Sequence, residues 1–219
     1  MIPAGFNVPE YELLAGTART SAPAWASPLA ERRVLLYLAR VHEAKGIDDL
    51  ITAWIELAPA HPDWDILIVG PGLADEVRPR QELIAARGLA NRCHWTGIIP
   101  DVERTWAYLH ADLYVLPSHK ENFGNTVQEA LGHGTATITT TQTPWLKLET
   151  WGCGWVCEDN ASSLTETLAK ALTRTSSELK TMGERGQRII MNDYSLESVV
   201  SRQLALYEDL IKGRELSKL

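Results

Sequence analysis

The stretch Val34-Leu-Leu-Tyr-Leu-Ala39, followed after a short polar loop by Ile47–Ala58, decides the fold of this sequence. The first run is short and continuously apolar, which predicts a strand buried on both faces of a sheet. In the second run large apolar side chains recur at helical spacing, and Asp48 and Asp49 stand in the first turn, where acidic residues are favourable. The pair therefore predicts a strand followed by an amphipathic helix.

The same alternation continues along the chain. We predict further strands at residues 65–70, 93–97, 112–117, 135–140 and 154–157, and helices at residues 76–87, 102–110, 125–133, 162–173, 176–191 and 195–211. Buried strands that alternate with amphipathic helices form parallel sheets with right-handed crossovers and helices on both faces. The expected fold class is therefore α/β, a doubly wound parallel sheet of the Rossmann type.

Residues 17–28, TARTSAPAWASP, interrupt this pattern near the N-terminus. They are rich in Ala, Ser and Pro and show no apolar periodicity, which predicts a linker or surface loop. We therefore expect residues 1–30 to form a leading segment and linker. Residues 31–195 would then form the Rossmann-like domain, and residues 196–219 a C-terminal helix.

Composition and charge exclude several classes of function. The 219 residues are 45% hydrophobic and 22% charged, which is ordinary for a globular chain. Lys and Arg number 21 against 28 for Asp and Glu, so the formal net charge is -7. A broad basic surface for nucleic acid is therefore not expected, and an anionic ligand must be held by a few local groups.

Cysteine usage and hydropathy bound the compartment. Cys93, Cys153 and Cys157 are too few and too unevenly spaced for a disulfide framework or a zinc site, so we expect reduced thiols with packing roles. Apolar stretches are strand-sized, well short of the roughly 20 residues that span a bilayer. The first residues lack the basic and apolar regions of a signal peptide. A cytoplasmic location is therefore expected.

Two cations lie in the loop after the first predicted strand, Arg40-Val-His-Glu-Ala-Lys45-Gly46. In doubly wound sheets ligands bind outside the carboxyl ends of the strands, where this loop lies. Arg40 can grip a diphosphate through its planar fork, and Lys45 can act as a point charge. The alternative is that both are solvated surface cations.

The second candidate site is residues 117–134, PSHKENFGNTVQEALGHG, where a strand ends and a helix begins at about Asn125. Gly124 allows the backbone to approach a ligand, and the first helical amides are donors suited to phosphate. Glu129 lies one turn later on the same helix face, where its carboxylate oxygens can accept from both hydroxyls of a ribose. Glu121 lies in the loop, nearer to whatever the phosphate carries. The alternative is a helix start whose acidic residues only favour the dipole.

Rival motifs carry less weight. A P-loop of the G-x-x-x-x-G-K-[ST] type and a G-x-G-x-x-G after a strand are both missing from the sequence. Asp63-Trp-Asp65 fits a metal-binding D-x-D pattern, but it precedes a strand at the opposite edge of the sheet, so no metal is expected. His119 lies inside the second candidate loop. Trp145 and Trp151 either pack in the core or line an acceptor or base pocket.

Together these residues resemble a known family. The pattern E-N-F-G-x-x-x-x-E-A-L-x-x-G at 121–134, preceded by A-D-L-Y-V-L-P-S and followed by T-I-T-T-x-x-T-P-W, resembles the retaining glycosyltransferases of family 4. Similar segments occur in the family's order at residues 1–7, 38–46, 68–72, 95–97 and 194–195. These enzymes have the GT-B fold, in which two Rossmann-like domains face each other and the C-terminal one mainly holds the nucleotide-sugar donor. The resemblance covers nearly the whole chain and implies the C-terminal half of a GT-B enzyme.

The resemblance also implies roles for individual residues. Arg40 and Lys45 would hold the donor diphosphate, Glu129 the ribose, and Glu121 the transferred sugar. The implied catalytic residues are thus Glu121, Arg40 and Lys45, and the implied donor-binding residues are Asn122, Phe123, Gly124, Asn125, Glu129, Ile98 near the base, and Gly70. Two positions depart from the family pattern, because Ala39 replaces a Gly and Ala136 replaces a Pro.

The implied activity is transfer of a hexosyl group from a nucleoside-diphosphate sugar to a hydroxyl acceptor with retained configuration. The acceptor would be a glycan or a lipid-linked sugar of lipopolysaccharide or surface-polysaccharide synthesis, and the enzyme cytoplasmic or peripheral at the inner face of the membrane. Neither a cofactor nor a metal is implied, and nucleic acid is not an expected partner. The alternatives are a noncatalytic nucleotide-sugar binding module that needs a partner domain, and a sugar-nucleotide epimerase.

In that family an N-terminal domain of similar size carries the acceptor site. We expect the final helix, with its apolar residues, to pack partly on such a domain; these residues are Val199, Val200, Leu204, Tyr207, Leu210 and Ile211. An excised donor domain, a separately encoded subunit and a truncated reading frame would each explain a chain of this length.

Overall fold

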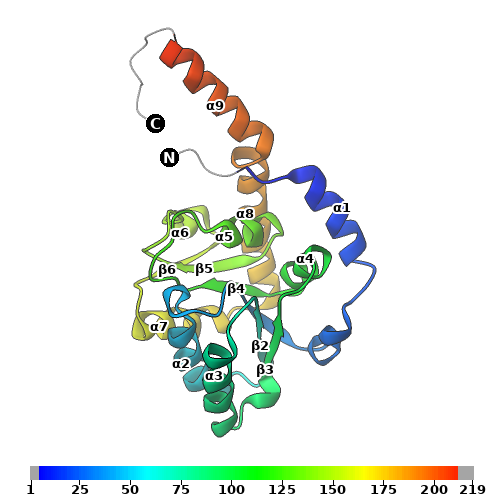
Figure 1. Cartoon of the computed structure of the whole chain (residues 1–219), viewed down its shortest axis with the longest axis vertical. Coiled ribbons are helices and arrows are strands. Elements are labelled where there is room, and N and C mark those ends of the chain that lie inside the picture. The colour runs from blue at the N-terminus through cyan, green and yellow to red at the C-terminus, as the bar shows by residue number, and fades with distance from the viewer. Residues whose placement is uncertain (1–4, 212–219) are drawn as a thin grey trace.

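The computed structural model describes residues 5–211. Residues 1–4 of the expected leading segment and residues 212–219 of the expected C-terminal helix lie outside the described residues. A six-stranded parallel sheet forms the centre, in the order β3-β2-β1-β4-β5-β6 (Figure 1). Its strands are β1 Arg33–Leu38, β2 Trp64–Val69, β3 Cys93–Gly97, β4 Leu113–Leu116, β5 Ala136–Thr140 and β6 Gly154–Cys157. The predicted doubly wound α/β fold is confirmed.

Helices cover both faces of the sheet. They are α1 Val8–Ala18, α2 Ile47–Leu57, α3 Ala74–Ala86, α4 Asp101–His110, α5 Asn125–Gly132, α6 Leu148–Trp151, α7 Ala161–Leu172, α8 Ser176–Asp193 and α9 Leu196–Ile211. Alternate residues of β1 explain the two layers: Leu35 and Tyr37 enter a core with α2, α3 and α7, whereas Leu36 and Leu38 enter a core with α4 and α5. A central strand must be apolar throughout because both its faces are covered.

The leading segment differs from the expected loop. Residues 17–28 contain the end of α1 and most of a 3₁₀ helix, Ala24–Leu29, and α1 packs on α4. Ala18 and Ala26 are buried, and the ring of Trp25 meets that of Trp106 edge-on, with centroids 5.3 Å apart. Alanines that allow close packing leave no row of large apolar side chains, so the periodicity that predicts a helix is missing here.

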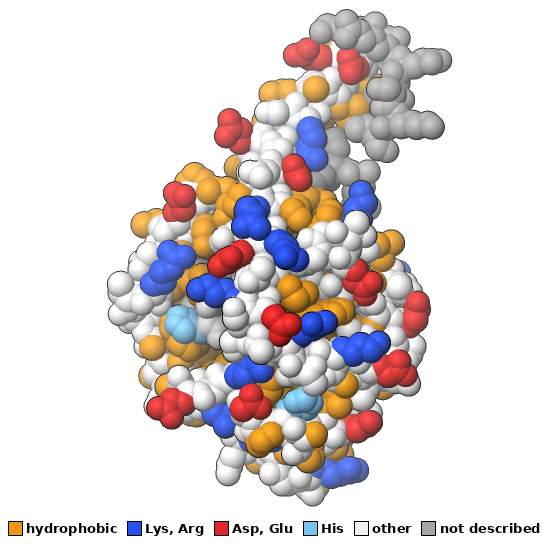
Figure 2. All heavy atoms as spheres, turned by 180° about the vertical axis from the view of Figure 1, so that it is seen from behind, with side chains coloured by type: hydrophobic (Ala, Val, Ile, Leu, Met, Phe, Trp, Pro, Cys, Tyr) orange, Lys and Arg blue, Asp and Glu red, His pale blue; other side chains and the backbone are white. Residues whose placement is uncertain are grey.

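The segment around Phe6 pairs with the junction between α8 and α9. The Phe6 N–H donates to the Tyr194 carbonyl at 2.7 Å, and the Leu196 N–H donates to the Phe6 carbonyl at 2.8 Å. From this junction α9 projects away from the body (Figures 1 and 2). Of its predicted apolar set Val199 is buried, while Leu204 and Tyr207 are more than half exposed, at 57% and 58%. Within residues 5–211 no helix has the length and apolarity needed to cross a membrane.

Aromatic rings join α1 to α5 beside this junction. The His133 ring stacks on Tyr108 and meets Tyr11 edge-on, with centroids 4.9 Å away in each case. Its Nδ1 lies 2.7 Å from the Glu129 carbonyl. Burial is the main reason that the pKa of His133 falls from 6.5 to about 4. The neutral ring is therefore part of the packing between these helices.

Two glycines bring loops together at the carboxyl-terminal edge of the sheet. Gly46 has φ +68°, and a Cβ there would lie 1.9 Å from the Pro117 carbonyl oxygen. Gly70 has φ +136°, and a Cβ there would lie 2.0 Å from the Ala39 carbonyl oxygen. Side chains are therefore excluded at both places by backbone of a neighbouring loop.

Replacing Gly46 by Ala should destabilise the fold by about 2 kcal/mol or more, because a positive φ and a steric clash act together. Gly88 is a matched control, since its φ is +72° but a Cβ there would meet open space. Gly88→Ala should cost only about 1 kcal/mol, the cost of the left-handed conformation. Urea unfolding measures both, and equal losses would contradict the clash at Pro117.

The pH dependence of stability should contain a contribution from His133. Folding lowers the pKa of His133, so between about pH 6.5 and pH 4 the unfolded state binds this proton more tightly than the folded state does. The contribution of the buried neutral ring to the free energy of unfolding is therefore complete above pH 6.5 and is lost as the pH falls toward about 4. His133→Phe should flatten the fall in unfolding free energy over that range. His110, an exposed histidine whose Nδ1 also lies near the carbonyl four residues earlier, is the control. If His110→Phe flattens the profile as much, burial of His133 is not the cause.

Candidate active site

The strand order places both candidate loops side by side. In the order β3-β2-β1-β4-β5-β6 the chain changes direction of winding between β1 and β4. Doubly wound sheets bind ligands at this switch point, outside the carboxyl ends of the strands. The loop with Arg40 and Lys45 follows β1, and the loop with Glu121 and Gly124 follows β4. The two candidate loops are thus brought together by the topology.

An ion pair connects these two loops. The Lys45 Nζ lies 2.5 Å from the Glu121 Oε2, and both side chains are largely buried. The His119 N–H also donates to the Ala44 carbonyl at 3.1 Å, so backbone holds the loops together as well. Arg40 is exposed, and its carbonyl accepts from the buried Tyr37 hydroxyl at 2.7 Å. The charge of Lys45 is thus balanced by Glu121, a pairing that the sequence did not reveal.

The start of α5 lies at the same edge of the sheet. Gly124 precedes the helix with φ +79°, and its carbonyl accepts from the N–H groups of Val127 and Gln128. The earlier amides of a helix have no intrahelical partner, and the dipole places positive charge there. Asn125 and Asn122 are exposed beside them. This arrangement suits an anion such as phosphate.

Trp145 holds this loop through a hydrogen bond from its side chain. Its side chain is buried, and the indole N–H donates to the Phe123 carbonyl at 2.6 Å. Of the two interpretations of this residue, packing in the core is therefore the observed one, with a direct bond to the candidate loop. Trp151 is only half-buried and packs against Tyr194.

Glu129 is held by a residue that the sequence analysis missed. The buried Tyr108 hydroxyl donates to the Glu129 Oε2 at 2.9 Å. Burial raises the pKa of Glu129, and the hydrogen bond from Tyr108 opposes this shift. One carboxylate oxygen is thus already engaged, and Oε1 has the larger remaining capacity for a ligand hydroxyl. No local pattern marks Tyr108, because its partner lies on another helix.

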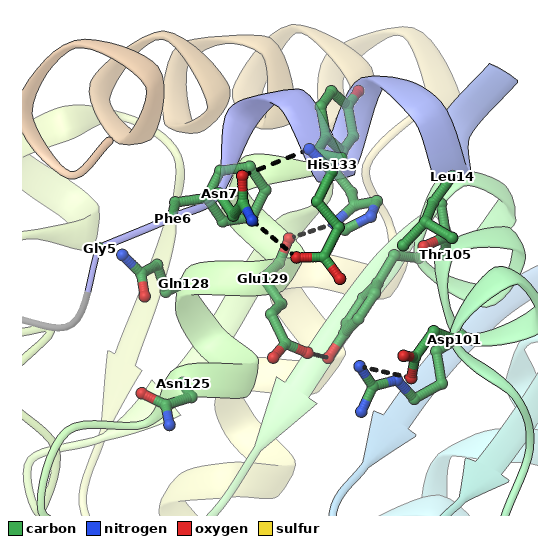
Figure 3. Close-up of a pocket in the computed structure, with 14 residues that line it drawn as sticks. Gly5, Phe6, Asn7, Leu14, Asp101, Thr105, Asn125, Gln128, Glu129 and His133 are labelled. Atoms are coloured by element: carbon green, nitrogen blue, oxygen red, sulfur yellow. Dashed lines mark hydrogen bonds and ion pairs between the residues drawn. The ribbon is translucent and has the colours of Figure 1, made fainter. Parts of the chain in front are cut away.

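A pocket of about 280 Å³ opens beside Glu129, between α1, α4 and α5. In Figure 3 the Glu129 carboxylate lies between Asn125 and Asp101, and Asn7 and Phe6 close the other side. Asp101 and Arg104 form an ion pair at 3.2 Å at the start of α4. The pocket is therefore lined by both acidic and basic side chains. Its α1 wall was not foreseen, because α1 itself was not predicted.

Ile98 and Gly70 lie at the same edge of the sheet. Ile98 follows β3 and is 78% exposed, which leaves an apolar side chain open to a ligand. The Gly70 N–H donates to the Gly97 carbonyl at 2.9 Å, so this amide already has a partner. Gly70 therefore shapes the loop, and its predicted contact with a donor stays a prediction.

Other residues singled out from the sequence have structural partners. The three thiols are free and buried, and burial raises the pKa of Cys93, Cys153 and Cys157 to about 12. Their predicted packing role is confirmed. Asp65 of the D-x-D pattern lies in β2 and pairs with Arg32 at 2.7 Å, at the edge opposite the candidate site.

Comparison with known proteins identifies a family for this chain. Residues 24–189 match the family described as Glycosyl transferases group 1. One relative is the lipopolysaccharide core biosynthesis mannosyltransferase LpcC of Rhizobium leguminosarum bv. viciae, 29% identical over 85% of this chain and 53% of the relative. The chain spans about half the length of the curated relatives it matches.

Solved structures show the same fold. The C-terminal domain of a glycosyl transferase group 1 family protein (LpcC) from Francisella tularensis superposes with a TM-score of 0.67 at 19% identity, over 89% of this chain and 96% of that domain. Anabaena HepE, solved in complex with UDP, gives a TM-score of 0.75 at 21% identity, over 95% of this chain and 56% of that protein. The fold is that of the C-terminal half of a GT-B enzyme. On the family match over most of its length, the chain belongs to the glycosyl transferases group 1.

Proposed function

We propose that this chain is the donor-binding half of a retaining hexosyltransferase, which moves a mannosyl group from a nucleoside diphosphate to a hydroxyl acceptor. The observation that carries the proposal is the meeting of Lys45, Glu121 and the start of α5 at the switch point of the sheet. The name of the Rhizobium relative supports mannose as the sugar and a lipopolysaccharide core glycan as the acceptor. A cytoplasmic or peripheral membrane location stays a prediction.

Catalysis in this proposal is electrostatic. The bond between the sugar and the diphosphate breaks through an oxocarbenium-like transition state, so negative charge grows on the leaving diphosphate. Arg40, Lys45 and the amides at the start of α5 are aimed at that charge, where fixed positive groups lower the barrier. When the diphosphate binds, it shares Lys45 with Glu121. Glu121, which remains beside Lys45, would also contact the transferred sugar.

The donor nucleoside would occupy the pocket beside Glu129. Its ribose hydroxyls would donate to the Glu129 carboxylate, and its base would lie near the exposed Ile98 and the start of α4. Burial removes water from the Glu129 carboxylate. Hydrogen bonds from a bound ribose would take the place of that water and would compensate the cost of keeping the carboxylate ionised. Neither a metal nor a cofactor has a role in this proposal.

An N-terminal GT-B domain is the proposed partner. Four apolar side chains of α9 are more than half exposed and would lose water on contact with a second domain: Leu204, Tyr207, Leu210 and Ile211. Half the length of the curated relatives lies outside this chain, which leaves room for such a domain. The competing function is a noncatalytic module that binds nucleotide sugars.

Donor binding should depend on the two cations. Titration calorimetry with UDP, GDP and ADP should identify the preferred nucleotide, and Arg40→Ala or Lys45→Ala should weaken its binding by about 1 to 3 kcal/mol, the value of a charged hydrogen bond. Lys45→Ala should be the more damaging, because it leaves the Glu121 carboxylate unbalanced beside the phosphates. Lys170→Ala, an exposed site on α7, is the control. Unchanged affinity in both variants would remove the assignment.

Sugar transfer should require the second domain. The chain alone should bind the nucleotide without transferring mannose, and addition of the N-terminal half of the Rhizobium relative should restore transfer. Replacing Leu204 and Tyr207 by Ser should abolish the restoration without changing nucleotide affinity, because both side chains lie on the exposed face of α9. Transfer by the chain alone would refute the need for a partner, and the lack of any transfer with the partner would favour the noncatalytic module.

A further inference from the structure

Trp145 lies at the carboxyl-terminal edge of the sheet, in the loop after β5. The loop is fixed by Thr143, whose hydroxyl donates to the Thr140 carbonyl at 3.1 Å and accepts from the backbone N–H of Trp145 at 3.4 Å. Because β5 pairs with β4, the loop after β5 lies beside the loop that ends at Gly124. A large aromatic side chain is thus held next to the loop that forms the candidate phosphate site.

The indole is enclosed by three neighbours. Its N–H bonds the Phe123 carbonyl, and its edge lies so close to Gly124 that a Cβ there would be 3.2 Å from the indole nitrogen. On another side its ring packs against Tyr194, with centroids 5.2 Å apart. The Tyr194 carbonyl in turn accepts from the Phe6 N–H at the junction between α8 and α9. The bond to Phe123 is therefore made by a side chain that has little freedom to move.

This bond determines which way an amide points. In a planar trans peptide the carbonyl and the N–H project to opposite sides. The Phe123 carbonyl points to the buried indole, so the N–H of Gly124 in the same peptide points away from the indole. A glycine with positive φ can rotate easily, and without the indole this peptide has no such restraint.

We propose that Trp145 is a positioning residue for donor binding, which holds the Phe123–Gly124 peptide with its N–H aimed at the diphosphate. The inference rests on the proposed function, because it assumes that a diphosphate is bound at the start of α5. It adds a residue that does not touch the ligand. A preorganised amide contributes to binding without the entropic cost of ordering the loop when the ligand arrives.

The test compares a nucleoside diphosphate with its nucleoside. Trp145→Phe keeps an aromatic ring against Gly124 and Tyr194 but removes the N–H, so affinity for the preferred diphosphate among UDP, GDP and ADP should fall about tenfold. Affinity for the corresponding nucleoside should not change, because it depends on the pocket beside Glu129. Trp151→Phe, at a half-buried Trp that also packs on Tyr194, should leave both affinities unchanged.

A second variant separates positioning from stability. Trp145→His is smaller and should unfold more readily, yet its Nε2–H lies at the ring position of the indole N–H. Diphosphate affinity should therefore decrease in the order wild type, Trp145→His, Trp145→Phe, even where the melting temperatures rank the two variants in reverse. Equal diphosphate affinities in wild type and Trp145→Phe, or equal losses for diphosphate and nucleoside, would overturn the inference. If the wild-type chain binds none of the three nucleotides, the proposed function itself fails.

Discussion

The contact between Gly46 and the Pro117 carbonyl is the constraint on which the candidate site depends. It places the loop after β1 directly against the loop after β4, and only a residue without Cβ fits there. The ion pair of Lys45 with Glu121 and the backbone bond from His119 to Ala44 follow from that closeness. Two loops from separate βα units therefore behave as one surface at the switch point of the sheet.

The net charge of the molecule limits where an anion can bind. With a formal net charge of -7, and with acidic and basic side chains interspersed over the face seen in Figure 2, the protein offers no general attraction to anions. Positive potential has to be assembled locally, from Lys45, the exposed Arg40 and the start of α5. Glu121 balances Lys45, and an unpaired cation that is largely buried would be costly.

Much of the fold could be predicted from the sequence. Most strand and helix boundaries were predicted to within two residues, since a sheet covered on both faces requires apolar strands and amphipathic helices. The meeting of the two candidate loops was also predictable, because loops that follow the strands of a parallel sheet lie at one edge of that sheet. The prediction of a loop at residues 17–28 was right only for residues 19–23, because α1 and the 3₁₀ helix occupy the two ends of this range, pack through Ala18 and Ala26 and carry no periodic apolar signal.

The sequence by itself determined the layers of the fold, the edge at which a ligand can bind and the residue types present there, because these depend on periodicity and on short-range turn chemistry. Only the tertiary structure decided which groups meet. Tyr108 bonds to Glu129, Trp145 to Phe123, and Phe6 pairs with the backbone around Ser195. Each of these contacts joins elements that are distant along the chain. Their geometry depends on how whole helices and strands pack, which no local pattern encodes.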